Sequence, residues 1–273
     1  DEGTFLSLDF QQIIGGRMKR ITWVLFSSLF AFSASGQNLT LDTLRAKLKT
    51  VSGGWVAGET KVSVLSRDDQ KRLLGSNFPD QSDFFFPRKK VTSYGNSSWD
   101  WRSVSGKNYA SPILDQGRCG SCVAFASIAQ LETQMNITRK TVDSPWAFSP
   151  QHLFACGGGT CEKGWMPYSA LSFLQNRGVP DEACLPYTSG ASGDDVACSR
   201  SCSDSQSRSQ KIVRYATTSF FFASTAKLKK AIEKGPLLAT MTIYEDFTFY
   251  KSGVYKHTTG KSLGGHSVVI EGW

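Results

Sequence analysis

The stretch "PILDQGRCGSCVAFASIAQLETQ", Pro112 to Gln134, places two cysteines three positions apart where a Gly-containing loop meets a helical pattern. After Cys122, apolar residues recur at helical spacing, and neither proline nor glycine interrupts them. The pattern predicts that Cys122 lies in the first turn of a buried amphipathic helix. Three interpretations fit the two cysteines: a redox pair, half of a zinc site, or one structural cysteine beside one reactive cysteine.

Composition narrows the class of protein. The chain has 273 residues, of which 40% are hydrophobic and 12% aromatic, so it can bury one sizeable core or two small ones. Its formal charge of +8 forms no basic stripe with interleaved aromatic residues, so we expect no nucleic acid partner.

A secretory signal peptide is predicted near the start of the chain. From Met18 the sequence reads "MKRITWVLFSSLFAFSASGQ", with a basic start, an apolar run and small residues before Gln37. The apolar run is shorter than the roughly 20 residues that span a bilayer. We therefore expect a signal peptide at 18–36, an upstream extension without function at 1–17, and no membrane anchor after cleavage. The chain would enter the secretory pathway, reaching a lysosome or vacuole in a eukaryote and the periplasm or exterior in a bacterium.

Secretion changes how the seven cysteines are interpreted, because thiols pair in an oxidising compartment and an odd number leaves one over. A redox pair would follow a buried strand, but a loop precedes Cys119. A zinc site shared with Cys198 and Cys202 lacks the usual ligand spacing, so we expect neither metal nor cofactor. The remaining interpretation makes Cys122 a nucleophile, whose thiol pKa the positive end of a helix would lower.

The same stretch supplies partners for a nucleophile. Gly120 would let a substrate backbone approach closely, and Gln116 could donate its side-chain N–H to an oxyanion beside the Cys122 backbone N–H.

Of the three histidines, His266 is favoured as the general base. Two glycines precede it, and the strand-like run from Ser267 to Ile270 follows it. His152 is expected to be structural, in a helix that begins with a serine cap and a proline. His257 is expected to be exposed in a polar turn.

The chain resembles the papain-like cysteine peptidases. Their nucleophile signature corresponds here to Cys119-Gly120-Ser121-Cys122-Val123, with Val123 in place of the usual aromatic residue. The stretch "YEDFTFYKSGVYKHTTGKSLGGHSVVIEGW" is similar to the region around the catalytic histidine of cathepsin B-like enzymes. "LRAKLKTVSGGWVAG" with "DDQKRLLGS" resembles a short cathepsin B-type propeptide. The resemblance extends over most of the chain from Leu41 to Trp273.

The resemblance implies an α+β, papain-like fold of two lobes behind a propeptide. We expect a propeptide at 37–95, a helical lobe at 96–210 and a β-barrel-like lobe at 211–273. In the family an asparagine orients the catalytic histidine, and no asparagine follows His266 here. We therefore expect that the second lobe is incomplete at its C-terminus and that the sequence is a fragment of a longer reading frame.

The resemblance also implies site residues. It pairs Cys119 with Cys161, Cys156 with Cys184 and Cys198 with Cys202, leaving Cys122 free. Gly164 would pair with an extended peptide substrate through its backbone. The main specificity pocket would be lined by Trp165, Met166, Thr240 and Ser267, although Trp165 and Met166 fit core packing equally well.

The predicted function is that of a secreted cysteine peptidase zymogen, which cleaves peptides or proteins through a thiolate–imidazolium pair of Cys122 and His266. We expect a monomer inhibited by its own propeptide, with Trp55 and a helix over 41–49 lying along the cleft. The loop "TSGASGDDVACSRSCSDSQSRSQK" is predicted to be mobile, and it lacks the paired histidines on which cathepsin B exopeptidase activity depends, so endopeptidase activity is favoured over aminopeptidase-like trimming. Two alternatives remain: an inactive peptide-binding relative, and a secreted redox protein that uses Cys119 and Cys122.

Overall fold

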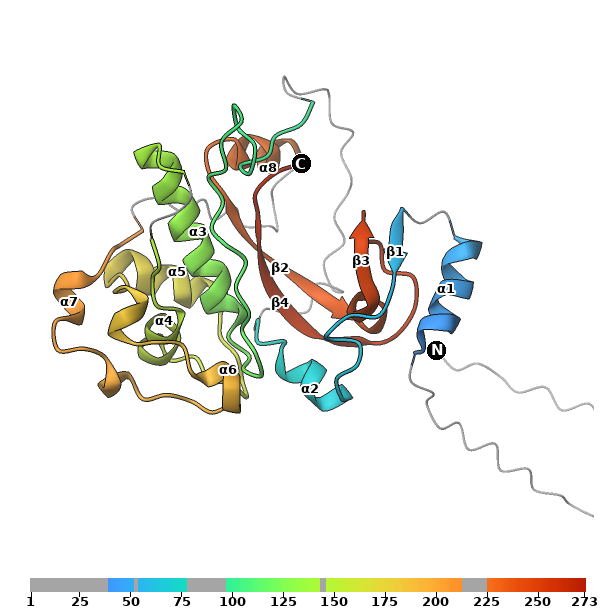
Figure 1. Cartoon of the computed structure of the whole chain (residues 1–273), viewed down its shortest axis with the longest axis horizontal. Coiled ribbons are helices and arrows are strands. Elements are labelled where there is room, and N and C mark those ends of the chain that lie inside the picture. Colours follow the sequence, from blue (N-terminus) through green and yellow to red (C-terminus); the bar gives the residue numbers. More distant parts are fainter. Residues whose placement is uncertain (1–38, 52–53, 78–96, 143–145, 213–224) are drawn as a thin grey trace, which may run out of the picture. The chain divides into compact units, whose positions relative to one another are not determined.

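The computed structural model describes residues 39–51, 54–77, 97–142, 146–212 and 225–273, and Leu39–Trp273 form one compact unit. The predicted signal peptide at 18–36 and the predicted boundary near residue 95 lie outside the described residues. Helices and strands both occur, which confirms the predicted α+β class. Figure 1 labels the elements in chain order: α1 (Leu41–Thr50), β1 (Trp55–Ala57), α2 (Arg67–Arg72), α3 (Cys122–Arg139), α4 (Pro150–Gly157), α5 (Pro167–Asn176), α6 (Ser189–Ser192), α7 (Ser205–Arg208), α8 (Thr225–Ile232), β2 (Leu237–Tyr244), β3 (Tyr250–Gly253) and β4 (Ser262–Ile270), with 3₁₀ helices at Glu182–Cys184, Cys198–Arg200 and Glu245–Phe249.

Helix α3 is central to the described helical part. It begins at Cys122, as the sequence predicted, directly after the N-cap residue Ser121. Helices α4 and α5 pack against it, and strands β2 and β4 contact it as well. Side chains on most of its faces are therefore buried, rather than those of a single apolar face. The largest fully buried side chains of this core are Phe154, Ile128, Leu131, Leu153 and Leu174.

The described strands form two separate two-stranded sheets, and no barrel closes within the described ranges. Strands β2 and β4 are antiparallel, with the register running from Leu237 opposite Ile270 to Thr240 opposite Ser267 and Met241 opposite His266. Because β4 contacts α3, this pairing holds the centre of β4 beside the helix that begins at Cys122.

The described part of the predicted propeptide, residues 39–51 and 54–77, is called the prosegment below. Its helix α1 agrees with the helix predicted over 41–49, and Thr40 caps it through a capping box. Leu44 is fully buried, and with Trp55 it packs against Phe249, Tyr250 and Tyr255. Strand β1 pairs antiparallel with β3, so the prosegment adds a strand to the edge of the second lobe.

The three disulfides agree only in part with the predicted pairing. Cys119 bonds Cys161 as expected, but Cys156 bonds Cys198 and Cys184 bonds Cys202. The predicted pairs Cys156–Cys184 and Cys198–Cys202 are therefore wrong. The 3₁₀ helix that begins at Cys198 packs against the end of α4, and the Cys202 N–H donates to the Cys184 carbonyl over 3.1 Å. The backbone thus turns Cys198 and Cys202 toward different partners.

Candidate active site

Cys122 is the one cysteine of the seven that forms no disulfide, and it is 1% exposed. It occupies the first position of α3. The loop before it is fixed by the Cys119–Cys161 bond and by a hydrogen bond from the Gly120 N–H to the Cys161 carbonyl, with an N–O distance of 3.0 Å. The nucleophile candidate therefore lies on a rigid element, which favours a fixed reaction geometry.

The charge state of Cys122 differs from the sequence prediction. Burial raises the pKa of its thiol, and hydrogen bonding by backbone groups of Ser267, Gly75 and Val123 opposes that effect only in part. The prediction considered the helix N-terminus alone. In the folded chain Gly75 of the prosegment lies at the thiol as well, and removal of water from a thiolate outweighs the helix dipole.

His266 lies in β4 next to Ser267, whose backbone reaches the Cys122 thiol. Burial lowers the pKa of the imidazole. Its Nδ1 atom is buried and has no hydrogen-bond partner among the described residues. Both members of the predicted pair are thus shifted toward their neutral forms while the prosegment covers the site.

The other two histidines lie in settings unlike that of His266. His152 is buried in α4 behind the Ser149 cap, as predicted for a structural histidine. His257 is exposed in the irregular segment after β3, as predicted. Its side chain is 38% exposed, its ring stacks on Tyr244 at 3.8 Å, and its Nδ1 lies 3.2 Å from an oxygen of the fully buried Asp246.

Gln116 reaches the prosegment through its side-chain amide. Its Nε2 donates to the Cys119 carbonyl over 2.7 Å and to the Leu73 carbonyl over 3.0 Å. The carbonyl oxygen of Leu73 in the prosegment therefore accepts a hydrogen bond from the Gln116 amide. In a substrate complex, the corresponding acceptor would be the oxygen of the reacting carbonyl group.

The prosegment crosses the site with the short segment Leu73–Asn77. The Trp165 N–H donates to the Gly75 carbonyl over 2.7 Å, and the Asn77 N–H donates to the Trp165 carbonyl over 3.0 Å. On the other side, the Ser76 N–H donates to the Gly265 carbonyl over 3.1 Å. Backbone from both lobes therefore clamps this segment over Cys122.

This arrangement corrects the predicted position of the inhibitory contact. Trp55 and α1 do not lie at Cys122. The Trp55 ring packs 5.3 Å from that of Tyr255, and its Nε1 donates to the Lys256 carbonyl over 3.1 Å. They anchor the prosegment on the second lobe, and Leu73–Asn77 makes the contact with the nucleophile.

Two of the predicted substrate residues are glycines next to the prosegment. Gly120 and Gly164 serve close backbone approach, because a Cβ on Gly75 would lie 1.7 Å from the Gly120 oxygen and a Cβ on Gly164 would lie 2.0 Å from the Gly75 oxygen. The backbone of Trp165, one residue later, holds the prosegment, and the pairing of the Gly164 backbone with a substrate stays a prediction.

The predicted specificity pocket is only partly assembled around the prosegment. Ser267 is buried, and its hydroxyl donates to the Ser76 hydroxyl over 2.9 Å. Thr240 lies opposite Ser267 in the sheet. The Trp165 side chain packs against Phe154 in the core, whereas Met166 is 42% exposed at the start of α5.

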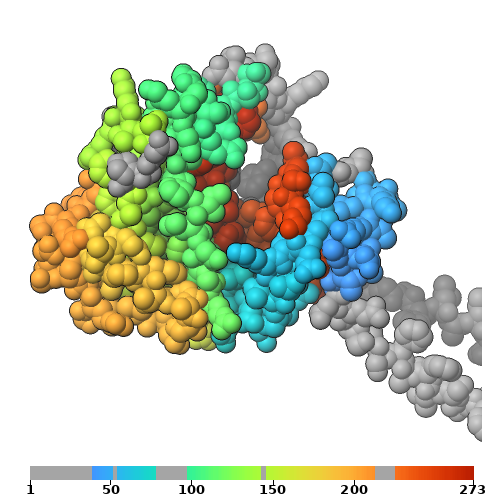
Figure 2. Space-filling view, in the orientation of Figure 1, coloured from blue at the N-terminus to red at the C-terminus, as the bar shows by residue number. Residues whose placement is uncertain are grey.

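A cavity of 530 Å³ lies beside the predicted catalytic residues. Gln116 and His266 line it together with Leu74 of the prosegment and the exposed residues Ile113 and Leu114. Figure 2 shows the hollow between the green segment that precedes α3 and the blue prosegment. Its size is typical of pockets that bind small ligands or a few residues of a peptide.

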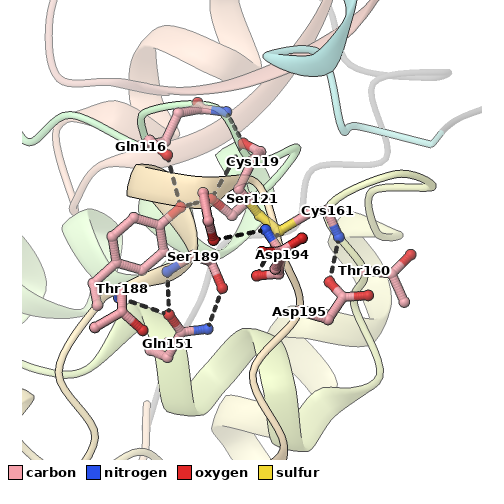
Figure 3. The surroundings of a disulfide bond; sticks show 12 residues. Gln116, Cys119, Ser121, Gln151, Thr160, Cys161, Thr188, Ser189, Asp194 and Asp195 are labelled. Carbon is pink, nitrogen blue, oxygen red and sulfur yellow. Dashed lines mark hydrogen bonds between the residues drawn. A yellow bond between two sulfur atoms is a disulfide. The ribbon is translucent and has the colours of Figure 1, made fainter.

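The segment from Thr188 to Cys202, predicted to be mobile, makes fixed contacts around the nucleophile loop (Figure 3). The backbone N–H groups of Thr188 and Ser189 both donate to the Gln151 side-chain oxygen over 3.0 Å. An Asp195 carboxylate oxygen accepts from the Cys161 N–H over 2.6 Å. These contacts and two disulfides hold the segment against the protein surface.

Neither a metal-binding cluster nor a membrane-spanning helix occurs among the described residues. No group of three or more His, Cys, Asp or Glu residues there is placed to hold a metal ion. None of the helices in the described ranges is long and apolar enough to cross a membrane.

Comparison with known proteins agrees with this geometry. The model of the papain family of cysteine proteases matches residues 95–273. Cathepsin B-like CP3 of Giardia intestinalis is 32% identical over 251 residues, which cover 89% of this chain and 81% of that protein. The gut-specific cysteine proteinase of Caenorhabditis elegans is 35% identical over 180 residues, covering 59% and 54%.

Solved structures of zymogens have the same fold. ProCathepsin B S9 from Trypanosoma congolense is 26% identical with a TM-score of 0.67, covering 86% of this chain and 83% of that one. Digestive procathepsin L 3 of Tenebrio molitor is 20% identical with a TM-score of 0.61, covering 85% and 72%, and indicates the fold alone. The chain therefore belongs to the papain family of cysteine proteases, within its cathepsin B-like branch.

Proposed function

We propose that the chain is the zymogen of a secreted cysteine endopeptidase in which Cys122 is the nucleophile and His266 the general base. One observation carries the proposal: the single free cysteine lies at the start of a buried helix, beside the strand that bears His266, under a clamped prosegment. Three disulfides fit an oxidising compartment and therefore the secretory pathway.

The chemistry starts when the thiol proton moves to the imidazole of His266. The Cys122 sulfur then attacks the substrate carbonyl carbon, so that a carbon–sulfur bond forms and the carbonyl oxygen becomes an oxyanion. The carbon–nitrogen bond breaks as the imidazolium gives its proton to the leaving amine. Water, deprotonated by the imidazole, then attacks the thioester, which releases the acid and restores the thiol.

Gln116 would stabilise the oxyanion together with the Cys122 backbone N–H. Its amide already donates to a carbonyl oxygen, that of Leu73, in the zymogen. A preorganised donor of this kind is typically worth about 10² to 10³ in turnover number. The same contact supports the prosegment as an inhibitor, because Leu73 and a substrate carbonyl would compete for the Gln116 amide.

Endopeptidase activity is favoured by the segment from Thr188 to Cys202. A carboxydipeptidase needs a cationic group at the cleft to hold the free carboxylate of its substrate. This segment contains no histidine or lysine, and its one basic residue, Arg200, lies in the 3₁₀ helix that packs against α4. It carries Asp194 and Asp195, and the Asp195 carboxylate accepts from the Cys161 N–H. Carboxylates there would repel a C-terminal carboxylate rather than bind it.

The redox alternative is disfavoured by the disulfide that Cys119 forms. A dithiol–disulfide couple of Cys119 and Cys122 requires a bond between these two sulfur atoms, but Cys119 bonds Cys161. The inactive, peptide-binding alternative predicts binding without turnover.

A pair of substrates tests the proposal. A fluorogenic dipeptide amide blocked at its amino end reports cleavage by the thiol, and a peptide quenched internally with both ends blocked reports endopeptidase activity. We expect the processed chain to cleave both, and an epoxide thiol inhibitor to abolish cleavage. Removal of dipeptides from free C-termini without cleavage of the blocked peptide would contradict the endopeptidase assignment, and binding without cleavage would support the inactive relative.

A further inference from the structure

We propose that Tyr187 is a positioning residue of this site, whose hydroxyl fixes the backbone of Gln116 and the start of α3 relative to each other. The inference rests on the proposed function and adds a residue to it. Tyr187 touches neither Cys122 nor His266 through any hydrogen bond of the described residues. Its effect would pass through the loop that carries the oxyanion donor.

Two hydrogen bonds place the Tyr187 hydroxyl between Gln116 and Ser121, at the two ends of the loop that leads into α3. It donates to the Gln116 carbonyl over 2.7 Å, and the Ser121 hydroxyl lies 2.7 Å from the same oxygen. A phenol has one proton to donate, so Ser121 is the donor in the second bond. Ser121 is fully buried and is the N-cap of α3, yet its side chain makes no capping bond to the helix. The Ser121 hydroxyl instead makes its shorter contact with Tyr187, at 2.7 Å, and a longer one of 3.5 Å with the Cys119 carbonyl.

The Tyr187 ring is held independently of its hydroxyl. It packs edge-on against Phe125, one turn after Cys122 in α3, with ring centroids 4.7 Å apart. The Tyr187 N–H donates to a Glu182 carboxylate oxygen over 2.6 Å. Burial raises the pKa of Tyr187 to about 12, so the hydroxyl keeps its proton through the acidic and neutral range and can always donate to Gln116.

Nothing else described holds the Gln116 carbonyl. Its neighbours have their own bonds, since the Arg118 N–H donates to the Gly190 carbonyl over 2.8 Å and the Gly117 N–H donates to an Asp115 oxygen over 2.9 Å. The Tyr187 hydroxyl is the one partner of the Gln116 oxygen among the described residues. Loss of that hydroxyl would release the backbone of Gln116 while the flanking contacts remain.

The atoms around the Tyr187 hydroxyl are closely packed, which leaves little room for another group to replace it as the donor to Gln116. A Cβ on Gly190 would lie 2.7 Å from the Gln116 oxygen and 2.8 Å from the Tyr187 ring. Tyr187→Phe keeps the ring and its contact with Phe125 and removes only the oxygen. The variant therefore tests the hydroxyl with little change to the core.

The test compares Tyr187→Phe with Tyr168→Phe, a matched control whose side chain is 70% exposed on α5. Five quantities are measured on the processed full-length chain: kcat and KM for a fluorogenic peptide, the inhibition constant of a peptide aldehyde, the rate of thiol alkylation by iodoacetamide, and the melting temperature. An aldehyde forms a bond from its carbonyl carbon to the sulfur and uses the oxyanion donors. Alkylation displaces iodide and does not use them.

We expect Tyr187→Phe to lower kcat by roughly tenfold, less than the 10² to 10³ typical of deleting an oxyanion donor outright. The aldehyde should bind more weakly by a similar factor, whereas KM and the alkylation rate should stay within about twofold. Ser121→Ala, which removes the other bond of the hydroxyl, should have a smaller effect in the same direction. Tyr168→Phe should match the wild type throughout.

Two results would overturn the inference. One is an unchanged kcat and aldehyde affinity in Tyr187→Phe. The other is a parallel loss of kcat, aldehyde affinity, alkylation rate and melting temperature, which would mean a purely structural role. A wild type that alkylates at Cys122 but cleaves no peptide would overturn the proposed function itself, and the inference with it.

Discussion

Gly75→Ala is expected to release the active site from its prosegment. A Cβ at this position would lie 1.7 Å from the Gly120 carbonyl oxygen and 2.4 Å from the Gly120 carbonyl carbon, both of which are backbone atoms. Real Cβ atoms stay at least 3.0 Å from such neighbours, so residue 75 must move by about 1.3 Å. Such a shift affects the three hydrogen bonds of 2.7 to 3.1 Å that clamp residues 75–77.

The expected loss follows from those three bonds. Each hydrogen bond contributes on the order of 1 kcal/mol, so together they are worth about 3 kcal/mol, or roughly a hundredfold in the inhibition constant. A peptide spanning residues 39–77 would be titrated against the processed enzyme with a fluorogenic substrate. Gly54→Ala in the same peptide is the matched control, because a Cβ there meets no atom within 4 Å.

The control should inhibit as strongly as the unchanged peptide. The reasoning fails if Gly75→Ala inhibits within about threefold of the unchanged peptide, since the clamp over Cys122 would then contribute little. It also fails if Gly54→Ala loses as much, since the loss would then reflect the peptide rather than the contact with Gly120.

Three other outcomes are expected. Cys122→Ala should abolish turnover and labelling by thiol reagents while leaving the melting temperature within a few degrees, whereas Cys119→Ala should lower that temperature markedly by removing a disulfide; full activity in Cys122→Ala would refute the assignment. Because burial raises the thiol pKa in the zymogen, alkylation of Cys122 at neutral pH should be slower before removal of the prosegment than after it, as followed by mass spectrometry; equal rates would contradict the described covering. Burial also raises the pKa of Glu132, Glu182 and Glu271 above the ordinary value of 4.5, so the folded state binds more protons than the unfolded state. Stability should then fall as pH rises from about 4.5 through the folded pKa values, and a denaturant series in which Glu132→Gln leaves that slope unchanged would exclude Glu132 as a cause.

Local sequence predicted the parts of the site that lie close together along the chain. The pattern from Cys119 to Gln134 predicted that a helix begins at Cys122, and α3 does begin there. The odd number of cysteines agreed with a free Cys122. The serine and proline before His152 gave the N-terminus of α4. In each case the determining contacts are local, so a pattern of a few residues is sufficient.

Contacts between distant segments were predicted less well. Six paired cysteines allow 15 connectivities, and spacing alone could not show that the 3₁₀ helix at Cys198 packs against the end of α4. The Cys122 pKa was predicted in the wrong direction because burial of the thiol raises it, and the depth of burial depends on packing between distant segments rather than on the residues around Cys122. The glycine at position 75, between Leu74 and Ser76, is the residue type that allows close approach of another backbone, and it could have been used to predict a backbone contact there.

Nothing in the immediate sequence of Tyr187 marks it as a residue of the site. Its importance comes from Gln116 and Ser121, which are more than 60 residues away. A hydrogen-bond partner at that separation follows from the packing of the lobe and not from a local pattern.

Active-site titration with an epoxide thiol inhibitor tests the central claim most directly. The processed chain would be incubated with the inhibitor, residual cleavage of a fluorogenic dipeptide amide would be followed, and the modified residue would be mapped by mass spectrometry. The account predicts one inhibitor per molecule, bound at Cys122, with loss of cleavage in proportion to labelling. Cleavage that persists after complete labelling of Cys122, or labelling of a different cysteine, would contradict it.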